Sequence, residues 1–91
     1  MNAKEHFKIN FGKRLSSLID NKNGISPLKK PVTRIELAKH IDSIDPPCSR
    51  QILYRYETGA ATPDLHRLKI IAEFFQVSYD YLLGESEAIQ R

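Results

Sequence analysis

Apolar residues recur at helical spacing in several short blocks of this 91-residue chain, and no stretch alternates apolar and polar residues as a half-buried strand does. The first block shows the pattern clearly, with apolar side chains three or four positions apart at Phe7, Phe11, Leu15, Leu18 and Ile19. No internal repeat is visible. The pattern predicts an all-α protein. A chain of this length supports one domain, with a radius of gyration of about 12 Å.

Residues that start or end helices separate these blocks. The first helix is predicted over residues 5–21, with Gly24 in the left-handed turn that follows it. Thr33 and Glu36 form a capping box, which predicts a second helix over residues 34–44. Two consecutive prolines come soon after it. Because proline lacks an amide hydrogen and disfavours a helical residue before it, the helix cannot continue.

Three further helices are predicted in the second half of the chain. Ser49 caps a helix over residues 50–58, which Gly59 ends. Thr62-Pro63-Asp64 opens a fourth helix, and Ser78 caps a short fifth one that ends at Gly84. The predicted inward-facing residues are Ile52, Leu53 and Tyr56 in the third helix, and Leu65, Leu68, Ile71, Ala72 and Phe75 in the fourth. We therefore expect one domain over residues 1–84 and a short polar tail over residues 85–91.

Composition excludes several classes of protein. The formal net charge of +3 tilts weakly toward an anionic partner. No apolar run approaches the roughly 20 residues of a membrane span, and no signal peptide is visible, so we expect a cytoplasmic protein. Cys48 is the single cysteine, which excludes an internal disulfide. With His40, Asp42 and Asp45 it makes a poor metal site, and a core thiol is the better interpretation. No catalytic motif, cofactor site or small-molecule site is evident, so an enzyme is not predicted.

Several short segments, in this order, carry a family resemblance. They are Phe-Gly-Lys-Arg-Leu at 11–15, Arg-Ile-Glu-Leu-Ala at 34–38, Tyr-Glu-Thr-Gly at 56–59, and the whole segment 68–83. Over residues 7–84 the chain resembles a Cro/lambda-repressor-type, XRE-like helix-turn-helix domain. The resemblance implies a five-helix lambda-repressor-like fold, with an unusually long turn inside the helix-turn-helix at residues 42–47.

The resemblance also implies sequence-specific binding of double-stranded DNA, with the helix over residues 50–58 in the major groove. Arg50 suits guanine and Gln51 suits adenine, while Tyr54 either touches DNA or packs its ring on a neighbouring loop. Arg34 replaces a phosphate-contacting glutamine of the family. The full set of expected DNA contacts is Lys29, Lys30, Arg34, Ser49, Arg50, Gln51, Tyr54, Arg55 and Thr58.

The chain also departs from the family at particular positions. Ile19 stands where the family has an arginine that pairs with the glutamate matching Glu57, which leaves Arg14, a backbone amide or solvent to pair with Glu57. Ala60 and Ala61 replace basic residues, and this weakens the expected phosphate contact there.

A second apolar strip on the fourth helix remains to be explained. His66, Ile70 and Phe74 lie off its predicted core face. Two explanations are open: the tail folds back through Ile89 to cover the strip, or the strip is a homodimer interface. A homodimer would match a palindromic operator. The sequence thus predicts a transcriptional regulator that acts as a repressor. The alternative is an antitoxin-like module that inhibits a partner protein and also binds its own promoter.

Overall fold

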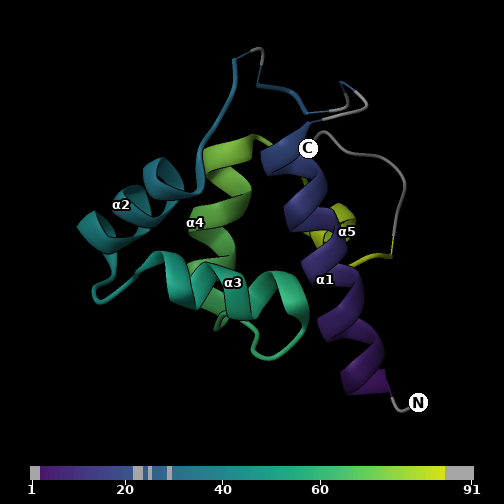
Figure 1. Cartoon of the computed structure of the whole chain (residues 1–91). Helices are drawn as coiled ribbons and strands as arrows, with labels where there is room; N and C mark the ends of the chain where they lie inside the picture. Colours follow the sequence, from purple (N-terminus) through teal and green to yellow (C-terminus); the bar gives the residue numbers. More distant parts are fainter. Residues whose placement is uncertain (1–2, 22–23, 25, 29, 86–91) are drawn as a thin grey trace.

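The computed structural model describes residues 3–21, 24, 26–28 and 30–85, and this part of the chain contains five helices and no strand (Figure 1). The helices are α1 (Ala3–Asp20), α2 (Arg34–Ile44), α3 (Arg50–Thr58), α4 (Leu65–Phe75) and α5 (Tyr79–Leu82). The all-α prediction is confirmed, and the radius of gyration is 12.1 Å. The predicted tail lies almost entirely outside the described residues, so the domain boundary at residue 84 stays a prediction.

Side chains cap the helices that follow a loop. In each case a side-chain oxygen of the cap residue accepts a hydrogen bond from a backbone amide of the first turn. That amide has no acceptor inside the helix, so the cap supplies one. The four caps are Thr33 from Glu36 N at 3.1 Å, Ser49 from Ile52 N at 3.4 Å, Asp64 from Arg67 N at 2.9 Å, and Ser78 from Tyr81 N at 3.0 Å. Pro63 thus lies before α4 and not in its first turn. Gly59 ends α3 in the left-handed conformation, with φ of 82°.

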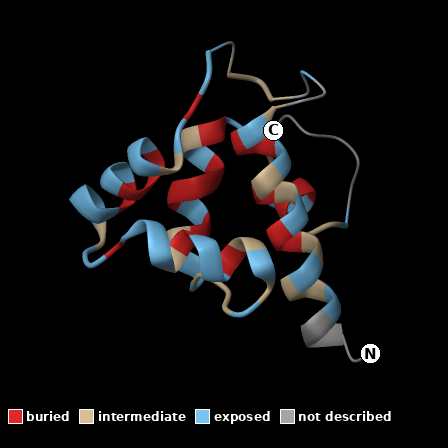
Figure 2. Cartoon of the chain, in the orientation of Figure 1, coloured by how far each residue is buried: buried red, intermediate tan, exposed pale blue. Residues whose placement is uncertain are grey.

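The helices surround a single core. α1 packs against α3 and α5, while α4 packs against α2 and α5, and α2 also contacts α3 (Figure 1). The buried faces of the helices turn toward one another (Figure 2). The largest fully buried side chains are Phe11, Leu15, Leu18, Leu37, Ile41, Leu53, Ile71, Phe75, Val77 and Leu82. This core supports the outward face of α3.

The crossing of α1 and α3 depends on Gly12. A Cβ atom at this position would lie 2.5 Å from the Glu57 carbonyl oxygen and 2.7 Å from that of Tyr56. Real Cβ atoms essentially never approach another heavy atom that closely. Gly12 therefore allows the backbone of α1 to touch the last turns of α3.

α1 begins at Ala3, two residues before the predicted start, and ends at Asp20, one residue before the predicted end. Asn21, directly after the helix, already has a left-handed backbone with φ of 48°, and its amide donates to the Ser17 carbonyl at 2.8 Å. Gly24 is also left-handed, with φ of 66°. Asparagine tolerates this conformation better than most residues, and this explains why α1 ends at Asp20. The predicted left-handed conformation of Gly24 is confirmed.

The predicted faces of α4 were wrong at two positions. Leu65, expected in the core, is 80% exposed, whereas Ile70, expected on a second strip, is only 6% exposed. The reason is that α4 is covered on more than one side. On the α2 side, the Phe74 ring centroid lies 4.9 Å from that of His40, so Phe74 is partly buried by the chain itself. Leu65, the first residue of the helix, lies beyond this cover. His66, Ile70 and Phe74 therefore form no continuous exposed strip.

Candidate nucleic-acid interface

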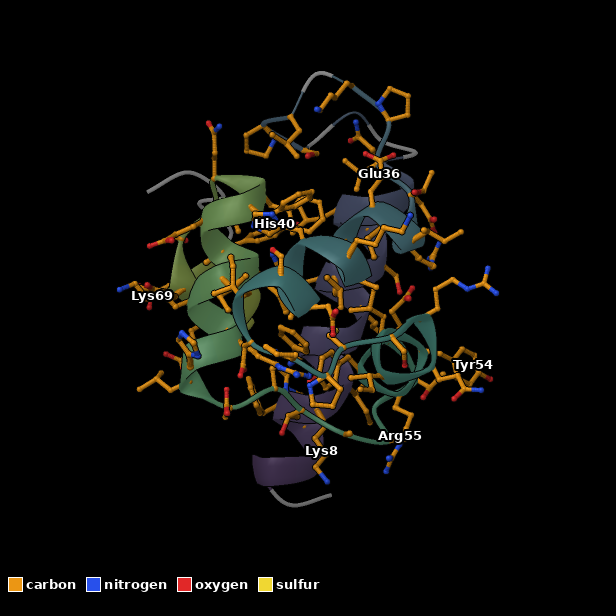
Figure 3. All side chains as sticks on the ribbon, turned by 90° about the vertical axis from the view of Figure 1, so that its left-hand side faces the viewer. Lys8, Glu36, His40, Tyr54, Arg55 and Lys69 are labelled. Carbon is orange, nitrogen blue, oxygen red and sulfur yellow. The ribbon has the colours of Figure 1, made fainter. Side chains whose placement is uncertain are left out.

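The two faces of α3 have opposite roles. Leu53 and Tyr56 are buried and attach the helix to the core, and Ile52 is partly buried beside them. The other face carries only exposed polar and aromatic side chains: Arg50, Gln51, Tyr54 and Arg55. Tyr54 is 68% exposed, so its ring does not pack on a neighbouring loop. Figure 3 shows the labelled Tyr54 and Arg55 side chains extending away from the core.

Two surface hollows adjoin the start of α3. The first, of about 530 Å³, is lined by Arg34, Arg50, Gln51, Tyr54 and Arg55. The second, of about 400 Å³, lies between α2 and α3 and is lined by Ile35, Ala38, Lys39, Asp42, Cys48, Ser49, Arg50 and Gln51. Sequence reasoning missed Ile35 and Lys39. Ile35 is 47% exposed, and its helical position, off the face of Leu37 and Ile41, was a signal that it points outward.

Arg34 is held by two carboxylates. Its Nε donates to both oxygens of Glu57, at 3.1 and 2.9 Å, and its Nη2 donates to Oε1 at 2.6 Å. Its Nη1 donates to Asp20 at 3.1 Å. The hydrogen bonds to Glu57 raise the pKa of Arg34 above its ordinary value, although partial burial works against this. Arg34 therefore links α1, α2 and the end of α3.

This pairing corrects the expected partner of Glu57. Besides Arg34, the Ser16 hydroxyl of α1 donates to Glu57 at 2.9 Å. Arg14 stacks instead on the Tyr81 ring, with its Cζ 4.3 Å from the ring centroid. The arginine that the family places late in the first helix is thus replaced by one from the start of α2.

The long turn between α2 and α3 is held by side chains. The Cys48 amide donates to the Asp42 carboxylate at 2.8 Å, and Arg67 of α4 donates to Asp45. The Pro46–Pro47 peptide bond is cis. Cys48 is 8% exposed, and burial raises the pKa of its thiol, as expected for a core thiol. Within the described residues, no three His, Cys, Asp or Glu side chains gather as metal ligands.

The other expected contacts are more scattered. Lys30 and Thr58 are exposed, and the Thr58 hydroxyl donates to the Arg55 carbonyl at 3.3 Å. Lys29 lies outside the described residues. Lys8, which sequence reasoning missed, lies in α1 beside Gly59: a Cβ on that glycine would be 3.8 Å from the Lys8 carbonyl carbon. In Figure 3, Lys8 and Arg55 extend toward the same edge of the molecule.

α2 and α3 are two short consecutive helices joined by a turn, the second with an exposed polar face and a buried apolar one, which is the arrangement of a helix-turn-helix. A family model described as Helix-turn-helix (HTH_3) matches residues 32–82, which is more than half of the chain. The chain belongs to this XRE-type helix-turn-helix family of DNA-binding transcription regulators. No curated protein matched the sequence. None of the helices in the described residues is both long and apolar enough to cross a membrane.

Proposed function

We propose that this protein is a sequence-specific transcriptional repressor that binds a palindromic operator as a homodimer. The observation that carries the proposal is the start of α3, where Arg50, Gln51 and Tyr54 are exposed on a helix whose opposite face is buried. Arg50 would pair with guanine and Gln51 with adenine, and Tyr54 would contact a thymine methyl group or a phosphate. Occupying a promoter in this way excludes other DNA-binding proteins from it.

We call the exposed side of α3 that carries Arg50, Gln51 and Tyr54 the reading face. Positive side chains around it would supply the phosphate contacts. Arg55, Lys30 and Lys8 suit this role because they are cations at or near the edge of α3 or in the loop before α2. Arg34 would contribute less to these phosphate contacts, because carboxylates already occupy part of its guanidinium. Its contacts use one N–H on each nitrogen, and because a guanidinium has five, two remain for a phosphate.

The operator is tested by selecting binding sites from a pool of random duplex DNA at a stated salt concentration. We expect one enriched motif with two-fold symmetry and half-sites about 34 Å apart. A promoter carrying that motif should lose reporter expression when the protein is produced. If the pool yields no motif, sequence-specific binding is refuted, and an asymmetric motif would refute the homodimer.

The strip of His66, Ile70 and Phe74 does not suit a dimer interface, because Ile70 is buried, so we propose a different surface. The better surface is a hollow of about 720 Å³, which we call the α4–α5 hollow, lined by Leu65, His66, Leu68, Lys69, Tyr79 and Leu83. Leu65 and Tyr79 are 80% and 42% exposed.

A second copy of the chain is the occupant that we propose for the α4–α5 hollow. A two-fold interface pairs a surface with itself, so it needs a projection and a recess, or both signs of charge, on one patch. The hollow offers exposed Leu65 as the projection and basic Lys69 in its lining, while acidic Asp64 and Asp80 are the chain neighbours of the lining residues Leu65 and Tyr79. Figure 3 places Lys69 and Tyr54 at opposite edges, so a second copy leaves the reading face accessible.

Leu65→Glu tests this surface, with Ile44→Glu as a matched control because Ile44 is also a large exposed apolar residue, at 49%. In sedimentation we expect the wild type and Ile44→Glu to be dimers and Leu65→Glu to be a monomer. Dimers throughout would point to another surface. A monomeric wild type would refute the homodimer and favour an antitoxin-like partner for the hollow.

A further inference from the structure

Arg67 of α4 makes more hydrogen bonds to the helix-turn-helix than an ordinary surface arginine makes. Its Nε donates to the Asp45 carboxylate at 3.0 Å, and its Nη2 donates to the Asp45 carbonyl at 2.7 Å and also to the Pro47 carbonyl. Its Nη1 donates to the Tyr56 hydroxyl at 3.2 Å. The side chain is 11% exposed. One guanidinium thus joins α4 to the turn and to α3.

The bonded atoms lie at two places that together orient α3. Asp45 and Pro47 belong to the chain entering the helix just before its cap residue, whereas Tyr56 lies near the helix end. Contacts at both places restrain the direction of the helix as well as its position. Arg50 and Gln51 lie between them, in the first turn.

The sequence of the turn explains why it needs an outside donor. Pro46 and Pro47 have no amide hydrogen, so they cannot close the turn by donating backbone hydrogen bonds. The carbonyls of Asp45 and Pro47 accept from Arg67 instead. A planar guanidinium can serve several acceptors at fixed angles, whereas a lysine ammonium is a single point charge on a flexible stem.

The charge on Arg67 is stable in this environment. Partial burial acts to lower the pKa of Arg67, but the hydrogen bonds that it donates to Tyr56 and Asp45 outweigh this effect, so the pKa is raised overall. His66 adds a weaker contact to the same carboxylate, with its Nδ1 3.7 Å from Asp45 Oδ2. No described contact of Arg67 reaches the exposed face of α3.

We infer that Arg67 is a positioning residue for DNA reading: it sets the orientation of α3 by holding the turn before it, and it touches no DNA itself. The inference rests on the proposed function, since it assigns a role to Arg67 in how Arg50 and Gln51 meet the bases. It also predicts a property of the free protein, which separates its failure from a failure of DNA binding.

The test compares Arg67→Lys with Ile71→Val. Arg67→Lys keeps the positive charge but loses the planar guanidinium that serves several acceptors. Ile71→Val removes one buried methyl group from the same helix, so it destabilises the protein while leaving Arg67 and its partners unchanged. Binding to the selected operator and to random duplex DNA is measured at the same salt, well below each melting temperature. We expect Arg67→Lys to lose roughly 5- to 150-fold in operator preference, about the loss of one good base contact. Ile71→Val should keep its preference.

Tyr56→Phe is a milder variant, because it keeps the buried ring and removes only the hydroxyl that Arg67 contacts. It should lower operator preference less than Arg67→Lys does. Two results would overturn the inference. Loss of thermal stability with unchanged preference would make Arg67 merely structural. Equal weakening on operator and random DNA, with a shallower salt dependence, would make it a phosphate contact.

Amide hydrogen exchange in the free protein gives the second measurement. The amides of Ile52 and Leu53 close the first turn of α3 on Ser49. Relative to amides of α1, they should exchange faster in Arg67→Lys and at the wild-type ratio in Ile71→Val. An unchanged ratio in Arg67→Lys would overturn the positioning role whether or not the wild type prefers an operator.

Discussion

The arginines on and around α3 lie in two different environments. Arg50 and Arg55 project from α3, are exposed, and make no ion pair with any described residue. Arg34 and Arg67 come from neighbouring helices, and each is held within 3.1 Å of a carboxylate oxygen. Arg50 and Arg55 are available to a ligand, whereas Arg34 and Arg67 link neighbouring elements of the fold to one another.

The difference shows that residue type does not decide the role of an arginine at a helix start. Glu57 is only 10% exposed in its side chain, and a nearly buried carboxylate is costly without a partner. It therefore accepts from two of the five N–H groups of Arg34, and Asp20 accepts from a third. Among the described residues no carboxylate forms an ion pair with Arg50, so its guanidinium stays available for a ligand.

The largest effect is expected from the double variant Arg50→Ala/Gln51→Ala. Each good base contact contributes about 1–3 kcal/mol, so preference for the selected operator over random DNA should fall by roughly 2–6 kcal/mol. Thermal stability should change by less than about 0.5 kcal/mol, because both side chains are exposed. Competition binding and thermal unfolding measure the two quantities. Unchanged preference would mean that another element reads the bases.

A smaller effect distinguishes the two environments directly. Arg34→Ala should lower the free energy of unfolding by about 1–2 kcal/mol, because Glu57 loses its partner while solvent screens part of the pair. Arg55→Ala should leave stability nearly unchanged and reduce the salt slope of DNA binding by about one. Chemical denaturation and binding across a salt series check both expectations.

Glu57→Gln provides the control for Arg34. Combined with Arg34→Ala, it removes the carboxylate that the first change leaves unpaired, so the double variant should recover part of the lost stability. If Arg34→Ala costs no stability but lowers the salt slope, Arg34 belongs with the reading-face arginines and the comparison fails.

The smallest effect concerns Ser49. This residue caps α3 and is also an expected DNA contact, so it combines a structural role with a binding role. Its hydroxyl caps α3 at 3.4 Å, and Ser49→Ala should cost about 1 kcal/mol of stability. Thr33→Ala, at the 3.1 Å cap of α2, should cost a similar amount. If Ser49→Ala keeps its stability but binds DNA less well, the hydroxyl contacts DNA and is not mainly a cap.

Local signals in the sequence predicted most of the fold. The caps at Thr33, Ser49 and Ser78 and the left-handed Gly59 act over three or four residues, so a linear pattern records them. The outward face of α3 followed from the same periodicity together with the family resemblance.

The remaining features depend on contacts between distant segments. Arg34 and Glu57 are 23 residues apart, and Arg67 and Asp45 are 22 apart, so no local pattern reveals either pair. The apolar side chains of α4 surround much of the helix, so their spacing alone did not show which side α2 covers. For that reason Leu65 and Ile70 were assigned to the wrong faces.

Gly12 lets α1 pack directly against the backbone of α3 and so fixes the position of that helix. Its hydrogen atom occupies the space between α1 and the last turns of α3, about 10 Å along the axis from Arg50. An added methyl group would displace that end of α3, and because the helix is short and stiff its first turn would change orientation as well. A single carbon atom at the far end of the helix would therefore shift Arg50 and Gln51, the side chains that we propose contact the bases.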